Sequence, residues 1–192
     1  MRKALANLIL PVAILVAGGA GYNNALAEGA DRNDSRIKLL EAVLKDDAKT
    51  VQDLLAQGVD PNVREAQRGP AVVMAASEAS YKALANLADV AATELDATNE
   101  EGETALMVVS KTGHLPSVKH LLKRGATLNV EGWTPLHLAA ANGHVGVLKL
   151  LIENKANLNA RSPNGTTAMM MAARMGQVTT YQALLLAGAD PT

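Results

Sequence analysis

Four histidines and a run of three methionines are the residues of this sequence that could do metal chemistry. His114, His120, His137 and His144 could bind zinc, but none is paired with an acidic residue or a second histidine at the spacing of a zinc site. Met169–Met171 offers thioethers, which suit copper. However, three consecutive residues of a helix point in three directions. We therefore expect structural roles for the histidines, core packing for the methionines, and no metal or other cofactor.

Other kinds of site chemistry have little support in the sequence. The chain has no cysteine, its serines stand in no repeated relation to a histidine, and it lacks a glycine-rich phosphate loop. Lysine and arginine total 18 against 19 aspartates and glutamates, for a net charge of -1 without a basic block. That balance does not favour binding to nucleic acid or to an anionic membrane. The sequence predicts neither an enzyme nor a nucleic-acid-binding protein.

The histidines and methionines belong to a repeated unit. Residues 132–144 read Gly-Trp-Thr-Pro-Leu-His-Leu-Ala-Ala-Ala-Asn-Gly-His, and a second copy over 165–177 begins 33 residues later. A third copy, over 102–114, begins 30 residues before the first, so its spacing is three residues shorter. Weaker copies stand at 71–80 and 37–47. The pattern therefore predicts five structural repeats.

Each unit predicts two short helices. Thr134 can cap the first helix, Pro135 suits its first position, and Gly143 permits the left-handed residue that ends it. The second helix carries its apolar residues on one face, at Val147, Leu148, Leu151 and Ile152. A helix pair of this size cannot bury its own core, so it must stack on its neighbours.

Residues Thr134 to Ala139, which read Thr-Pro-Leu-His-Leu-Ala, match the ankyrin signature T-P-L-H-x-A at the period of 33. The chain thus resembles the ankyrin-repeat family, and in particular small exported ankyrin proteins of Gram-negative bacteria. The resemblance implies an all-α solenoid of five helix-turn-helix repeats joined by short β-hairpin loops, and hydrogen bonds from His137 that tie neighbouring loops. Pro70 at the Thr position and Ala79 at the Gly position leave the bounds of the second repeat open. The domain is expected over 34–192, with repeats at about 34–66, 67–100, 101–130, 131–163 and 164–192.

The N-terminal residues are typical of a secretory signal. Arg2 and Lys3 precede a short apolar stretch, and Ala25-Leu26-Ala27 provides small residues at a cleavage site. We expect cleavage after Ala27, a short linker over 28–33, and a soluble periplasmic product without membrane insertion. The alternative, an uncleaved membrane anchor, also implies export.

The ankyrin resemblance implies a non-enzymatic protein-interaction module, expected to be a monomer with an unidentified protein partner. In this family the partner usually meets the concave face of hairpin tips and first helices. Two roles remain open, support of a periplasmic catalase in peroxide defence and immunity against an incoming toxin; a contrasting class is a heme- or metal-handling accessory. Mapped onto the matching positions, the expected partner-binding residues are Glu101, Glu103, Lys111, Thr112, Glu131, Trp133, Asn142, Arg161, Asn164 and Arg174.

The hairpin between the third and fourth repeats is expected to be shortened. Two residues separate Asn129 from Gly132, whereas five stand at the equivalent place in the neighbouring repeats. A notch should therefore interrupt the row of hairpin tips, with Glu100, Glu101 and Glu103 on one side, Arg161 on the other and Trp133 at its base. Trp133 has two open roles, binding the partner or covering the adjacent loop.

Overall fold

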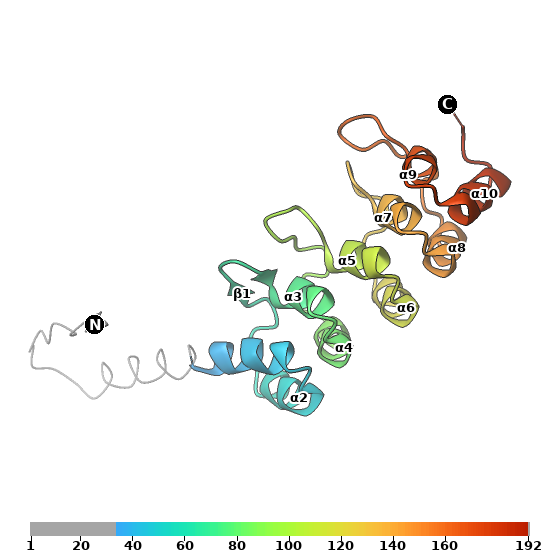
Figure 1. Ribbon diagram of the computed structural model, residues 1–192. Coiled ribbons are helices and arrows are strands. Elements are labelled where there is room, and N and C mark those ends of the chain that lie inside the picture. Colours follow the sequence, from blue (N-terminus) through green and yellow to red (C-terminus); the bar gives the residue numbers. More distant parts are fainter. Residues whose placement is uncertain (1–33, 192) are drawn as a thin grey trace, which may run out of the picture.

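The structure, a computed structural model, describes residues 34–191, which form five stacked helix pairs (Figure 1). The expected signal segment 1–27, the linker 28–33 and the last residue lie outside this range. The first helices of the pairs span 34–44, Ala71–Ser77 (α3), Ala105–Thr112 (α5), Pro135–Ala141 (α7) and Ala168–Arg174 (α9). The second helices are α2 (Ala48–Ala56), α4 (Tyr81–Asp89), α6 (Leu115–Lys123), α8 (Val145–Glu153) and α10 (Val178–Leu186).

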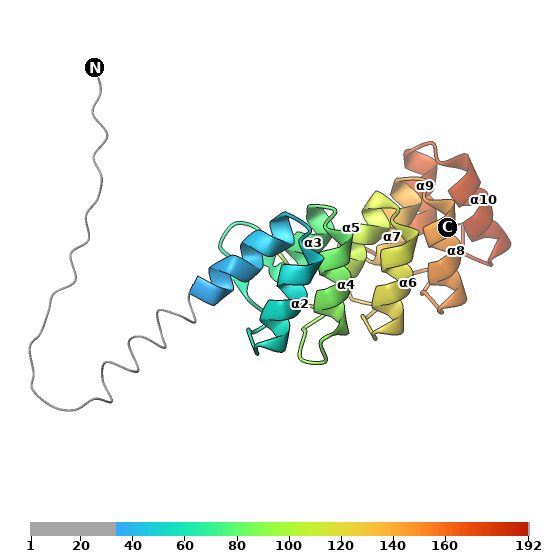
Figure 2. The ribbon, with the colours of Figure 1, turned by 90° about the horizontal axis from the view of Figure 1, so that it is seen from below.

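The two helices of each pair belong to two separate rows. Figures 1 and 2 show the first helices in one row and the second helices in the other, and in Figure 1 the connecting loops project beyond the first helices. Along the rows, α3, α5, α7 and α9 pack on one another in turn, as do α2, α4, α6, α8 and α10. We call the surface of projecting loops and first helices the loop face, and the exposed sides of the second helices the outer face. The expected all-α solenoid is confirmed, with one small antiparallel sheet of β1 (Arg64–Glu65) and β2 (Gly69–Pro70).

Threonines begin three of the first helices, as the sequence predicts. The side chains of Thr104, Thr134 and Thr167 each accept a hydrogen bond from the backbone N–H of the third helical residue. Such caps satisfy a donor that the helix leaves free. The degenerate second repeat differs, because α3 follows Pro70 without a side-chain cap.

A left-handed residue follows each first helix. Its φ lies between 50° and 79° in the five repeats, where it is Asp46, Ala79, Gly113, Gly143 and Gly176. At two of the glycines the next repeat also approaches closely. A Cβ on Gly113 would collide with the ring of His144, and one on Gly143 would collide with the side chain of Gln177. Glycine is therefore needed there for space as well as for φ.

A ladder of side chains joins the loops that end the repeats. In each case an Asn or Asp oxygen accepts the backbone N–H of a residue in the next repeat, at 2.7–2.9 Å. The acceptor and donor residues are Asn62 with Glu94, Asp96 with Thr127, Asn129 with Asn157, and Asn159 with Asp190. These bonds fix the spacing of one repeat against the next.

The core runs through all five repeats along the facing sides of the helices. On α8, Leu148 and Leu151 are fully buried, as the apolar face of that helix predicts, whereas Ile152 is half-buried. Met169 is 2% exposed and belongs to the continuous core. The expected core packing is confirmed for this methionine. Met171 is also buried, but it lies beside a groove on the loop face.

Candidate partner-binding surface

The loops of the loop face differ in length and in backbone pairing. Residues 64–70 carry β1 and β2, Thr98 pairs with Thr104 in an isolated bridge, and the N–H of Ser162 donates to the carbonyl of Thr166 at 3.0 Å. None of the bridges among the described residues falls within 129–133. In Figure 1 this loop is a narrow stub before α7, between the broader loops before α5 and α9. The predicted shortening of this hairpin is confirmed.

A groove of about 740 Å³ lies over the stub, and we call it the notch groove. The loop at 98–104, the stub and the loop of Pro163 frame it, and α5, α7 and α9 reach it from below. Its apolar lining consists of Met107, Val130, Trp133, Leu138, Pro163 and Met171. Its charged lining consists of Asp96, Glu101, Glu103, Glu131 and Arg174. The groove therefore combines an apolar floor with a mostly acidic rim.

Trp133 both lines the notch groove and packs against a neighbouring residue of the fold. Its half-buried side chain lines the notch groove and packs edge-on against His137, with ring centroids 5.5 Å apart and planes at 81°. Edge-to-face pairs of this kind add a modest stabilisation beyond the burial of the rings. The position of Trp133 therefore suits either of its two open roles, partner binding or packing.

The ring of His137, against which Trp133 packs, is fixed by hydrogen bonds on both of its ring nitrogens. The backbone N–H of Thr134 donates to Nδ1 at 3.2 Å, and Nε2 lies 3.0 Å from the carbonyl oxygen of Thr166. Because a carbonyl only accepts, Nε2 carries the proton of the neutral ring. The expected tie from His137 to the neighbouring loop is confirmed. Burial lowers the pKa of His137 below 6.5, against opposing backbone hydrogen bonds at Thr166 and Ala160.

This pKa shift predicts that the fold weakens below neutral pH. The folded-state pKa lies below the unfolded value of 6.5, so the unfolded chain takes up a proton first as the pH falls. Stability is fully present above pH 6.5 and is lost toward the folded-state pKa, by at most about 1.4 kcal/mol per pH unit for one proton. Burial also lowers the pKa of His114, which acts in the same direction.

The free energy of unfolding, measured with urea, should fall between pH 7.5 and pH 5.5. In His137→Asn, the slope of this free energy against pH should be smaller. His114→Gln separates the contribution of the other histidine. Asp47 does not interfere in this window, because hydrogen bonds from Thr50 lower the pKa of its carboxyl from 3.8. If the free energy of unfolding of His137→Asn depends on pH as that of the unchanged chain does, protonation of His137 is not coupled to unfolding.

The acidic residues of the notch groove fall into two groups. Glu103 is half-buried and bonded to Lys111 at 3.0 Å, and Asp96 accepts hydrogen bonds from the N–H and the hydroxyl of Thr127. Glu101 and Glu131 are exposed, and neither carboxylate forms an ion pair with a described residue. The two exposed carboxylates are therefore available to a partner.

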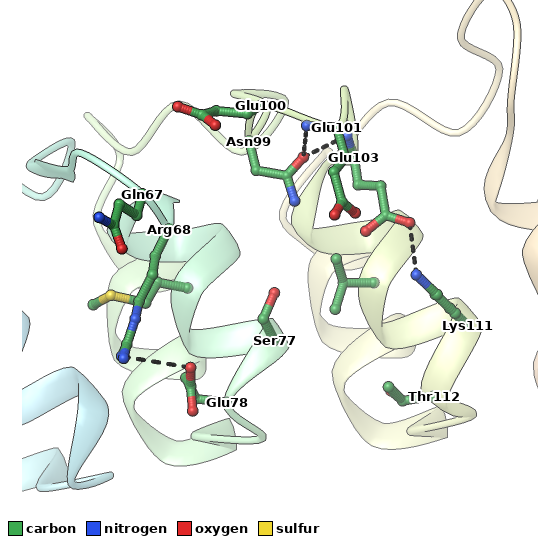
Figure 3. Close-up of a pocket in the computed structure, with 12 residues that line it drawn as sticks. Gln67, Arg68, Ser77, Glu78, Asn99, Glu100, Glu101, Glu103, Lys111 and Thr112 are labelled. Atoms are coloured by element: carbon green, nitrogen blue, oxygen red, sulfur yellow. Dashed lines mark hydrogen bonds and ion pairs between the residues drawn. The ribbon is translucent and has the colours of Figure 1, made fainter.

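A second, more polar groove of about 390 Å³ adjoins the first, between α3 and α5 (Figure 3). Met74 and Val108 contribute apolar side chains, and Ser77 and Thr112 contribute hydroxyls. Figure 3 shows an ion pair on each side, Arg68 with Glu78 at 3.5 Å on the α3 side and Lys111 with Glu103 on the α5 side. Its charged walls are therefore largely paired within the fold, unlike the rim of the notch groove.

The structure brings together most of the residues predicted to bind a partner. Trp133, Glu131, Glu101, Glu103 and Arg174 line the notch groove. Lys111 and Thr112 line the adjoining groove, which also includes Glu101 and Glu103.

Three of the predicted residues, Asn142, Arg161 and Asn164, are exposed but line neither groove. The expectation that Arg161 flanks the notch is wrong. Its guanidinium donates to the carbonyl of Gly165 at 3.1 Å, and Pro163 takes the flanking place. Asn164 likewise accepts hydrogen bonds within its own hairpin, from Ser162 and Thr166.

Sequence reasoning missed the apolar floor of the notch groove. Leu138 is half-buried and lines the groove together with Met171, which occupies the equivalent position one repeat later. The sequence did contain a signal of this floor, because the same position of the first helix is apolar in successive repeats. Val108 occupies this position one repeat before Leu138 and lines the adjoining groove. A recurring position can therefore serve both the core and the surface.

Within the described range 34–191, no group of three His, Asp or Glu side chains could hold a metal ion. In the same range no helix has the length and apolar character needed to cross a bilayer.

Comparison with known proteins assigns the family. A family model described as ankyrin repeats (three copies) matches residues 39–131 and again 127–192. Ankyrin repeats are generally protein–protein interaction modules, and the family is typically non-enzymatic. A search among curated proteins found no match. Since the two matches cover most of the sequence, from the first helix to the end of the stack, the chain belongs to the ankyrin-repeat family.

Proposed function

We propose that the protein is an exported binding module that holds a protein partner on its loop face. The observation that carries this proposal is the pair of adjoining grooves, which run across the loops and first helices of the second to fifth repeats. Both are open to solvent, and their exposed residues include Glu101 and Glu131, whose carboxylates form no ion pair with a described residue. Trp133, Met171 and Arg174 are of residue types enriched at protein interfaces.

Export is the second part of the proposal and rests on the N-terminal sequence. The basic Arg2 and Lys3, the apolar stretch and the small residues before Glu28 favour translocation and cleavage. The absence of cysteine is compatible with an oxidising compartment, because no thiol is open to oxidation there. The protein would then meet its partner in the periplasm, as a monomer.

A photo-crosslinking experiment in cells tests both parts. Glu131 on the loop face is replaced by p-benzoylphenylalanine, and Gln182, an exposed residue of α10 on the outer face, is replaced in the same way as the matched control. We expect an adduct with one protein from position 131 and none from position 182. The chain recovered by osmotic shock should begin at Glu28 by mass spectrometry.

Each part of the proposal can fail separately. Adducts from position 182 alone would move binding to the outer face. A chain that keeps its first residues and stays in the cytosol would contradict export. The identity of the captured protein decides between the two open roles, because a catalase points to peroxide defence and a toxin to immunity.

A further inference from the structure

The notch groove differs from the rest of the loop face in one respect that bears on the partner's chemistry. Its floor is apolar, whereas its rim carries acidic side chains that the fold leaves exposed. We propose that it takes an extended segment of the partner that inserts a large apolar side chain and carries lysine or arginine beside it. This inference rests on the proposed function and specifies what the loop face recognises.

The apolar anchor follows from the shape of the groove. The stub at 129–133 does not fill the space between its neighbours, so the side chains of Leu138 and Met171 are reached from the loop face. The resulting volume of about 740 Å³ lies within the range of about 300–1,000 Å³ that is typical of binding pockets. Met107 and Met171 add flexible thioethers that can adapt to the inserted group.

The basic neighbours follow from the charge of the rim. Four carboxylates and one guanidinium line the groove. Lys111 offsets only Glu103, with which it is paired. Glu101 and Glu131 therefore remain as exposed carboxylates without an ion pair to a described residue. Glu101 and Glu131 reach the groove from the broad loop before α5 and from the stub, so a segment that follows the groove passes both. Complementary charge steers and orients such an encounter, and like charge opposes it.

Arg174 lies with the apolar groups of α9, where its Nη2 is 3.2 Å from the sulfur of Met171. Its guanidinium forms no ion pair with a described residue. The groove therefore has a mainly acidic rim with one cation next to its floor. That asymmetry favours a basic segment over an acidic one and leaves the guanidinium free to bond a backbone carbonyl of the segment.

A random peptide library selected on the purified mature chain tests the inference. Selected peptides should share an aromatic or aliphatic residue next to lysine or arginine. Tryptophan-free versions are then titrated while the emission of Trp133 is followed, since this is the only tryptophan of the chain. Glu131→Lys should weaken binding by about tenfold or more at low salt. Glu153→Lys makes the same charge change on α8, away from the notch groove, and should leave the affinity within about twofold.

The inference is overturned by any of three results: selected peptides that are acidic or uncharged, equal affinity for Glu131→Lys and the unchanged chain, or no selected peptide that alters the emission of Trp133. These results differ from a failure of the proposed function. If the peptides fail while position 131 still crosslinks to a partner in cells, binding on the loop face stands and only its assigned chemistry falls.

Discussion

Replacing Leu151 by alanine should lower the free energy of unfolding by about 2–5 kcal/mol. Leu151 is fully buried on α8, the helix that packs between α6 and α10 in the row of second helices. Truncation removes buried apolar surface and leaves a cavity that the neighbouring helices cannot fully close. Since each repeat is stabilised mainly by contacts with the next, the loss should be felt in the whole stack.

Urea unfolding followed by the fluorescence of Trp133 measures this effect. Leu186→Ala is the matched control, because it removes the same side chain from a position on α10 that is 89% exposed. The control should change stability by no more than about 0.5 kcal/mol, the range of ordinary surface substitutions. A loss of that small size for Leu151→Ala would mean that the apolar face of α8 is not part of the core.

The helices and their ends could be predicted from the sequence because short-range rules determine them. The caps at Thr104, Thr134 and Thr167 and the left-handed φ of the glycines that follow the first helices depend on residues within the same repeat. The shortened hairpin could also be predicted, because it follows from a count of residues. Local rules and the repeat period thus account for most of the fold.

Contacts between repeats could not be predicted from the sequence in the same way. Asp46 is an example. Its carboxylate accepts the N–H groups of Lys82 and Ala83 at 2.9 Å each, and so caps α4 of the next repeat. Its partners lie 36 and 37 residues away in the chain. Such a bond depends on how two repeats are offset, which residue spacing within one repeat does not specify.

The candidate site was predictable to a similar extent. The notch and the place of Trp133 in it could be predicted from the residue spacing. That Pro163 rather than Arg161 lines the edge of the notch groove depends on which side chains form hydrogen bonds within their own loop. The guanidinium of Arg161 donates to a carbonyl of its own hairpin, and Arg161 does not line the notch groove. Exposed polar residues of tight loops are therefore weak predictions of a binding surface until their local hydrogen bonds are known.

Trp133→Ala should separate partner binding from folding. Loss of an aromatic anchor at the centre of an interface typically costs at least about 2 kcal/mol, or about 30-fold in affinity. Loss of its edge contact with His137 should lower the stability by about 0.5–1.5 kcal/mol, in addition to the loss of its partly buried surface. Trp133→Phe is the matched control, because a phenyl ring can keep much of the contact with His137 while filling less of the groove.

The most direct test of binding at the notch groove is therefore the affinity of Trp133→Ala for the protein captured by crosslinking, measured by titration calorimetry. Unfolding of the same variant is followed by circular dichroism, since the variant has no tryptophan left to report by fluorescence. We predict a loss of affinity of about 30-fold or more with a stack that still unfolds cooperatively. Unchanged affinity together with a clearly destabilised fold would contradict the account and assign Trp133 to the scaffold alone.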